Sequence, residues 1–167
     1  MLRSLRAIEG AIDAVLQRVA VAGIVALIAV MSLQIVSRVV FTATSWTEET
    51  ARYLLIWLTF LGACLAYRRG RHIAVTVLSD ALPPLGQRVC RGLIALVTIA
   101  FMAVLLQVGL DYMALQSFQQ SAALRIPMSV VYAVMPLSAA IMAYMAVVDL
   151  LEAVSGPPGD TADERHP

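Results

Sequence analysis

Charged residues are scarce in this sequence of 167 residues: Asp, Glu, Lys and Arg together make up 14%, against about 25% in soluble globular domains. Hydrophobic residues make up 60%. Because so few polar groups cannot cover a water-exposed surface, the composition indicates a membrane protein. Lysine is absent, and the formal net charge of +1 excludes the concentrated basic face that nucleic-acid binding requires.

Cysteine and histidine are also rare. Cys64 and Cys90 lie within or beside apolar segments and form no C-x-x-C motif, so we interpret both as packing residues, not as a disulfide. The two histidines are His72, which follows the second apolar segment, and His166, which lies in the polar tail, so neither lies inside an apolar segment. A haem held between helices is therefore not expected. The sequence predicts no cofactor, no metal site and no catalytic group.

Four long apolar segments are present, at about 19–41, 51–67, 92–113 and 127–151. Each approaches or exceeds the roughly 20 residues that an α-helix needs to cross a hydrocarbon core. The predicted fold is an all-α membrane protein with four transmembrane helices. A membrane β-barrel would instead show shorter segments with alternating polarity. The first segment is too long for the apolar part of a secretory signal, so we expect it to be retained.

Two more helices are predicted outside the spans. Residues 1–16 form an amphipathic segment that can lie at the membrane surface; an early extension of the first span into the cytosol is the alternative. Between spans two and three, an apolar face from Ile73 to Leu82 predicts a short interfacial helix, which Pro83 and Pro84 end. We treat residues 1–155 as one four-helix membrane domain and 156–167 as a disordered cytoplasmic tail. The apolar positions of the first segment are Leu2, Leu5, Ile8, Ile12 and Val15.

The arginines give the direction of insertion, since cytoplasmic loops of membrane proteins are enriched in basic residues. With a cytoplasmic N-terminus, only Arg38, Arg52 and Arg125 lie outside. We therefore expect a multi-pass protein of the bacterial inner membrane with both termini in the cytoplasm. The arginines placed inside are Arg3, Arg6, Arg18, Arg68, Arg69, Arg71, Arg88, Arg91 and Arg165.

The start of span two carries three charged residues, Glu48, Glu49 and Arg52. Glu48 and Arg52 have the favourable i, i+4 order for an ion pair. Ser45 and Glu48 match a capping box, and both acids suit the positive end of a helix dipole. Capping explains much of this pattern. The alternative is that one of the three charges pairs with another subunit.

Further along span two, Trp57 lies far from both interfaces. Its indole N–H then needs a partner within protein, which predicts a packed face. Gly62 and Ala66 have the four-residue spacing that allows close helix approach. The span ends in a basic cluster that we expect to set topology and to bind anionic lipid headgroups, with contact to a partner's cytoplasmic loop as the alternative. This cluster is Arg68, Arg69, Arg71 and His72.

The middles of the four spans contain no ionisable side chain. Because charged groups within the membrane mark ion pathways, this argues against a self-contained pump or antiporter. Arg38, Asp111 and Arg125 all fall near the predicted outer ends of the spans. Together with the Glu48 region they predict a polar belt that ties the helix ends together.

The second span and the entry to the fourth resemble a known family. The run W-T-E-E-x-x-R-Y-L-x-x-W-L-x-F-L-G-A from Trp46 to Ala63, then R-R-G-x-H-I from Arg68 to Ile73, is similar to the small, Q-type membrane subunit of tripartite ATP-independent periplasmic (TRAP) transporters. The segment L-x-I-P-x-S-x-x-Y from Leu124 to Tyr132 resembles that family's entry to its last helix. Thr76 stands where many members have an acid, which leaves the role of the interfacial segment open.

The resemblance implies a non-catalytic scaffold subunit. Its expected partners are a large multi-spanning membrane subunit, which holds the substrate and sodium sites, and a periplasmic substrate-binding protein. The expected cargo is an organic acid, in most cases a carboxylate. Two alternatives remain at this point: a stand-alone small multidrug exporter, although span one offers no membrane-embedded acid, and a four-span membrane redox protein, although two scattered cysteines do not make exchanging pairs.

Overall fold

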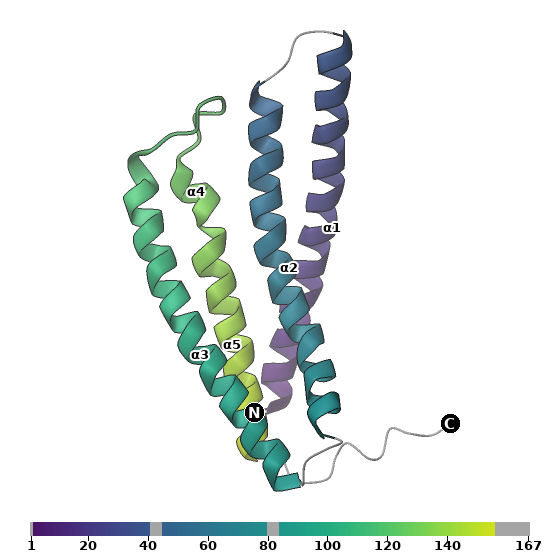
Figure 1. Cartoon of the computed structure of the whole chain (residues 1–167), viewed down its shortest axis with the longest axis vertical. Coiled ribbons are helices and arrows are strands. Elements are labelled where there is room, and N and C mark those ends of the chain that lie inside the picture. Colours follow the sequence, from purple (N-terminus) through teal and green to yellow (C-terminus); the bar gives the residue numbers. More distant parts are fainter. Residues whose placement is uncertain (1, 41–44, 80–83, 156–167) are drawn as a thin grey trace, which may run out of the picture.

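The computed structural model describes the backbone of residues 2–40, 45–79 and 84–155, and the side chains of 7–40, 45–70 and 86–154. These residues form helices joined by short connections (Figure 1), which confirms the all-α class. Four stretches are long and apolar enough to cross a membrane: Ala7–Val40, Ser45–Gly70, Gly86–Phe118 and Met128–Val154. The elements are α1 (Leu2–Val40), α2 (Ser45–Ser79), α3 (Pro84–Leu115), the 3-10 turn η1 (Gln116–Phe118), α4 (Met128–Tyr132) and α5 (Val134–Ser155).

The helices pair as two hairpins, α1 with α2 and α3 with α5. In Figure 1 the hairpins lie close together at the lower end and diverge toward the upper end, where α2 begins and α3 ends. We call the upper end the Glu49 end and the lower end the Arg68 end. Contact between the hairpins runs mainly through α2 and α5, so α2 is the helix that joins the two halves.

A small apolar core connects α1, α2 and α5. Its buried members are Leu16, Leu61, Cys64 and Met145. The Cys64 thiol donates to the Ser138 carbonyl at 3.7 Å, and both cysteines are free, as the sequence predicts. Cys64 therefore packs as a small apolar side chain with a weak donor.

Two glycines allow close helix approach within the chain. A Cβ at Gly23 in α1 would lie 2.9 Å from Leu58 Cδ2 of α2. A Cβ at Gly109 in α3 would lie 3.1 Å from Pro136 Cδ of α5. Pro136 also has no N–H to donate to the carbonyl four residues earlier, which accounts for the interruption at Ala133 between α4 and α5.

The two helices predicted outside the spans are not separate elements. The segment 2–16 continues into span one within α1, and 73–79 continues from span two within α2. The reason is that no proline interrupts either stretch, and a single glycine such as Gly70 costs only about 1 kcal/mol in a helix interior. Their position at the membrane surface stays a prediction. Residues 80–83 and the tail 156–167 lie outside the described residues.

Candidate functional site: the two ends of helix α2

At the Glu49 end, one carboxylate joins the two hairpins. Glu49 Oε1 accepts from the Tyr53 hydroxyl at 2.7 Å and from the Ala122 N–H at 3.1 Å. Glu49 Oε2 accepts from the N–H groups of Ala123 at 2.9 Å and Leu124 at 3.0 Å. We call these five residues the Glu49 latch. An ionised carboxylate has only acceptor sites, so it suits a group of convergent donors.

The local backbone explains why three consecutive N–H groups face Glu49. The loop before α4 closes on itself through Ser121 N–H to the Ile126 carbonyl at 2.9 Å and Arg125 N–H to the Ser121 carbonyl at 3.2 Å. The second bond makes one helical turn, whose first N–H groups have no partner within the turn. Arg125 ends it with a φ of 51°, in the left-handed region. The turn therefore presents free donors, and Glu49 of α2 receives them.

Glu48 and Arg52 form the predicted ion pair, with Arg52 Nη2 3.0 Å from Glu48 Oε1. Both side chains are largely exposed, at 62% for Glu48 and 67% for Arg52. An exposed pair of this kind contributes little to stability. Neighbouring acids in the sequence thus have different surroundings: Glu49 binds the loop, and Glu48 lies on the surface.

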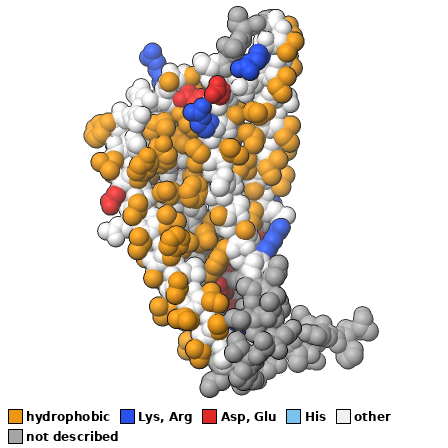
Figure 2. All heavy atoms as spheres, in the orientation of Figure 1, with side chains coloured by type: hydrophobic (Ala, Val, Ile, Leu, Met, Phe, Trp, Pro, Cys, Tyr) orange, Lys and Arg blue, Asp and Glu red, His pale blue; other side chains and the backbone are white. Residues whose placement is uncertain are grey.

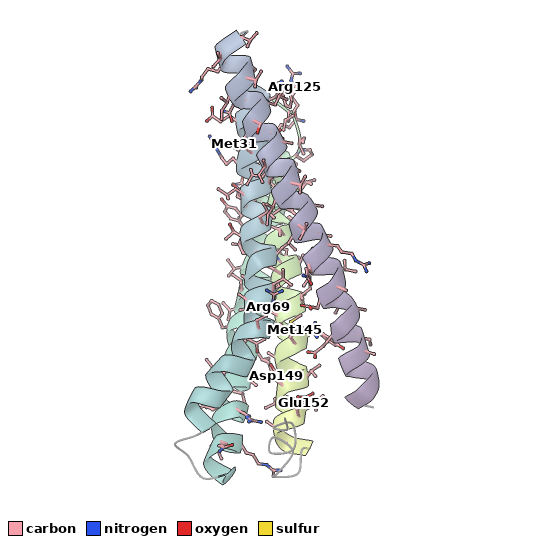
Figure 3. All side chains as sticks on the ribbon, turned by 90° about the vertical axis from the view of Figure 1, so that its right-hand side faces the viewer. Met31, Arg69, Arg125, Met145, Asp149 and Glu152 are labelled. Atoms are coloured by element: carbon pink, nitrogen blue, oxygen red, sulfur yellow. The ribbon has the colours of Figure 1, made fainter. Side chains whose placement is uncertain are left out.

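At the Arg68 end, two neighbouring side chains of α2 contact two different helices. Arg68 Nη1 lies 3.0 Å from Asp13 Oδ2 and donates to the Glu9 carbonyl of α1 at 3.1 Å. The Tyr67 hydroxyl donates to Asp149 Oδ2 of α5 at 3.2 Å. Figure 3 places Asp149 and Glu152 on α5 at this end, opposite Arg125. The sequence predicted a topological role for Arg68 and gave no sign of these contacts.

The other members of the basic cluster are Arg69, Arg71 and His72. Arg69 is exposed on α2 (Figure 3). Arg71 and His72 belong to α2 by their backbone, and their side chains lie outside the described part of the chain. Contact of this cluster with lipid headgroups or a partner loop stays a prediction.

The residues of span two that the sequence suggested for subunit contact or close packing fall on different faces of α2. They are Glu48, Glu49, Arg52, Trp57 and Gly62. Six exposed positions at helical spacing and the half-buried Gly62 form one face, which we call the open face. Gly62 lies between Thr59 and Ala66, and a Cβ there would meet nothing within 4 Å. Glu49 and Trp57 lie on other faces, and Trp57 shares a side with Tyr53 and Cys64. The hydrogen bond predicted for the Trp57 indole is not formed within the described residues. The open face comprises Glu48, Arg52, Leu55, Thr59, Gly62, Ala63 and Ala66.

The links between helix ends that the structure describes at the Glu49 end do not involve three of the charged side chains from which the sequence predicted a polar belt. Arg38, Asp111 and Arg125 are all exposed, and none of the three makes an ion pair with a residue that the structure describes. The Glu49 latch takes the place of such a belt, because backbone N–H groups supply the donors. Within the described residues, no cluster of three or more His, Cys, Asp or Glu side chains could hold a metal ion.

Comparison with known proteins is consistent with this architecture. Residues 27–156 match the family model for the DctQ component of tripartite ATP-independent periplasmic transporters. The chain is 43% identical over 72 residues to a putative TRAP transporter small permease protein of Haemophilus influenzae, a match covering 40% of this chain and 45% of that protein.

Two further relatives carry more specific names. The chain is 30% identical over 139 residues to the isethionate TRAP transporter permease protein DctMQ of Oleidesulfovibrio alaskensis, covering 78% of this chain and 22% of that one. It is 34% identical over 85 residues to the sialic acid TRAP transporter small permease protein SiaQ of Vibrio cholerae, covering 50% and 46%. The chain thus spans less than half the length of each of these three relatives.

Proposed function

The chain belongs to the DctQ component family of the tripartite ATP-independent periplasmic (TRAP) transporters, and we propose that it is the non-catalytic scaffold subunit of such a transporter. The observation that carries this proposal is the match to the family model over residues 27–156, together with a fold that places its charged groups at helix ends. The Glu49 latch and the Arg68 contacts hold helices together. Neither arrangement resembles an ion-coupling site, which usually lies near the membrane midplane with broken helices.

The proposed partner is a large multi-spanning membrane subunit that holds the substrate and sodium sites. The DctMQ relative supports this, because the segment that matches our chain makes up 22% of a much longer permease protein. A periplasmic binding protein captures the substrate and delivers it, as the family resemblance implies. The names of the relatives mention isethionate and sialic acid, which are both organic acids. The proposed process is uptake of an organic acid, driven by a sodium gradient.

The proposed orientation places the Arg68 end in the cytoplasm of a bacterium and the Glu49 end at the periplasmic side of the inner membrane. Nine of the twelve arginines then lie on the cytoplasmic side, as the positive-inside rule requires. The first turns of α1 and the last turns of α2 lie near the cytoplasmic lipid headgroups in this arrangement. Their amphipathic pattern and the neighbouring arginines suit that position.

The test is purification of the tagged chain in mild detergent after expression with its neighbouring genes. We expect one much larger membrane protein to co-purify. Reconstitution of this pair with its binding protein should give sodium-dependent uptake of one acid from a panel of organic acids, and proteoliposomes with this chain alone should give none. Recovery of the chain without a large partner would contradict the proposal, as would uptake by the chain alone.

A further inference from the structure

We propose that the open face of α2 receives a transmembrane helix of the large subunit. This inference rests on the proposed function and goes beyond it by assigning one face of one helix to the contact. The open face runs from the Glu48–Arg52 ion pair past Leu55 and Thr59 to Ala66. It points away from the residues that bind α5 and the loop.

The first observation is that α2 is poorly suited to lipid on its exposed side. Its span, Ser45–Gly70, is the least hydrophobic of the four, yet only 17% of its most apolar stretch is buried within the chain. The next least hydrophobic span, Met128–Val154, is 39% buried. The two most hydrophobic spans lie in α1 and α3 and can face lipid directly. A span with low hydrophobicity and little internal burial needs another protein surface.

The second observation is the kind of side chain that each helix exposes. On α2, the exposed large hydrophobic side chains are limited to Trp46 at its start and Leu55 among the residues described. Below Leu55 the open face has only small side chains: Thr59, Gly62, Ala63 and Ala66. Helices α1 and α3 instead expose many large aliphatic side chains, which is the surface expected against lipid. Examples are Val25, Ile28, Ile35, Leu93, Val97 and Val104.

The third observation concerns the glycines in the middles of the spans. Gly23 and Gly109 both lie where another helix of the chain approaches within contact distance. Gly62 is the third such glycine, and a Cβ there would meet nothing within 4 Å. A glycine in a helix interior costs about 1 kcal/mol relative to alanine. At Gly23 and Gly109 this cost is offset by close packing, and an incoming helix would offset it at Gly62 in the same way.

The shape and the composition of the open face indicate what kind of segment binds there. Small side chains let two helix backbones approach closely in a membrane, so a helix fits better than a loop or a headgroup. In the DctMQ relative the corresponding segment is part of a long permease chain, which indicates a partner in the same membrane. Figure 2 shows one face of the bundle as mainly hydrophobic, with acidic and basic side chains together near the upper end. The Glu48–Arg52 pair lies near the start of α2 and is largely exposed, so it marks the water-facing limit of the contact.

Photo-crosslinking in the assembled complex tests this assignment. A benzophenone amino acid is placed singly at Leu55 or Ala63 on the open face, and at Val25 of α1 or Val97 of α3 as exposed controls. Illumination of native membranes should join the open-face positions to the large subunit, at a yield at least about tenfold above either control. Crosslinks to the large subunit mainly from the α1 or α3 positions would overturn the inference, as would open-face crosslinks that give only a dimer of this chain.

A packing variant gives a second readout. Gly62→Leu should reduce the co-purified large subunit by about tenfold, with an unchanged amount of this chain in the membrane. Ala103→Leu places the same leucine side chain at an exposed position of α3 and should leave co-purification unchanged. Equal recovery of the partner with Gly62→Leu and with the parent chain would overturn the inference alone. Absence of a large subunit from the parent preparation would overturn both this inference and the proposed function.

Discussion

The two ends of α2 contact different parts of the bundle, and they do so by different means. At the Glu49 end, a single carboxylate binds three backbone N–H groups of a loop and one tyrosine hydroxyl. At the Arg68 end, Arg68 and Tyr67 contact carboxylates on α1 and α5, and the apolar core around Met145 lies nearby. The hairpins diverge toward the first end and pack together at the second (Figure 1). Packing therefore holds the Arg68 end, and one set of hydrogen bonds bridges the Glu49 end.

Truncating a side chain of the apolar core should cause the largest loss of stability. Met145 is fully buried and belongs to the same buried cluster as Leu16 and Leu61, so Met145→Ala should leave a cavity and lower the free energy of unfolding by about 3 kcal/mol. In thermal unfolding of the purified protein this corresponds to a decrease in Tm of roughly 10 °C. Leu137→Ala on the same helix is the control, because Leu137 is 48% exposed. Equal losses for the two variants would contradict a core at the Arg68 end.

Breaking the Glu49 latch should have an intermediate effect. In Glu49→Gln one acceptor oxygen becomes an NH₂ group that faces backbone N–H donors, so at least one donor loses its partner. We expect Tm to fall by roughly 5 °C and amide hydrogen exchange at Ala122, Ala123 and Leu124 to accelerate.

Glu48→Gln is the matched control one residue away, since it alters only the exposed pair with Arg52. It should change neither measurement appreciably. If the two variants behave alike, Glu49 is not the link between α2 and the loop, and the contrast between the two ends fails.

The smallest effect is expected at the Arg68–Asp13 pair, whose side chains are 25% and 28% exposed. A double-mutant cycle with Arg68→Met and Asp13→Asn should give a coupling of about 0.5–1 kcal/mol. Arg68→Met alone should cost more than Asp13→Asn, because it also removes the bond to the Glu9 carbonyl. Arg69→Met at the exposed neighbouring position should be close to neutral. Zero coupling would show that the Arg68–Asp13 pair does not help to hold the Arg68 end together.

Several features were predictable from sequence because they depend on local spacing. Hydrophobic segment lengths predicted the four spans, and the i, i+4 order of Glu48 and Arg52 predicted their ion pair. The two helices predicted outside the spans are not confirmed as separate elements, because 2–16 continues within α1 and 73–79 within α2. Amphipathicity indicates which surface a helix prefers, but it does not break the backbone hydrogen bonds that continue a helix.

The sequence could not distinguish Glu49 from Glu48. Adjacent helical residues point about 100° apart, and which of the two meets the loop depends on where α5 and the loop before α4 lie. The same is true of Gly62, whose spacing to Ala66 indicates close packing without saying against what. Only the arrangement of the four helices shows that Gly23 and Gly109 are occupied within the chain and that Gly62 is not.

The sequence by itself determined the membrane class, the number of spans and the resemblance to a transporter subunit, and the direction of the spans, taken from the arginine count, stays a prediction. These properties follow from composition, segment length and local motifs, which require no knowledge of how the helices pack. The tertiary structure decided that Glu49 binds backbone amides more than 70 residues away in the chain, that Arg68 pairs with Asp13, and that one face of α2 stays open. Such contacts depend on the relative placement of whole helices, and that placement is set by packing between segments distant in sequence.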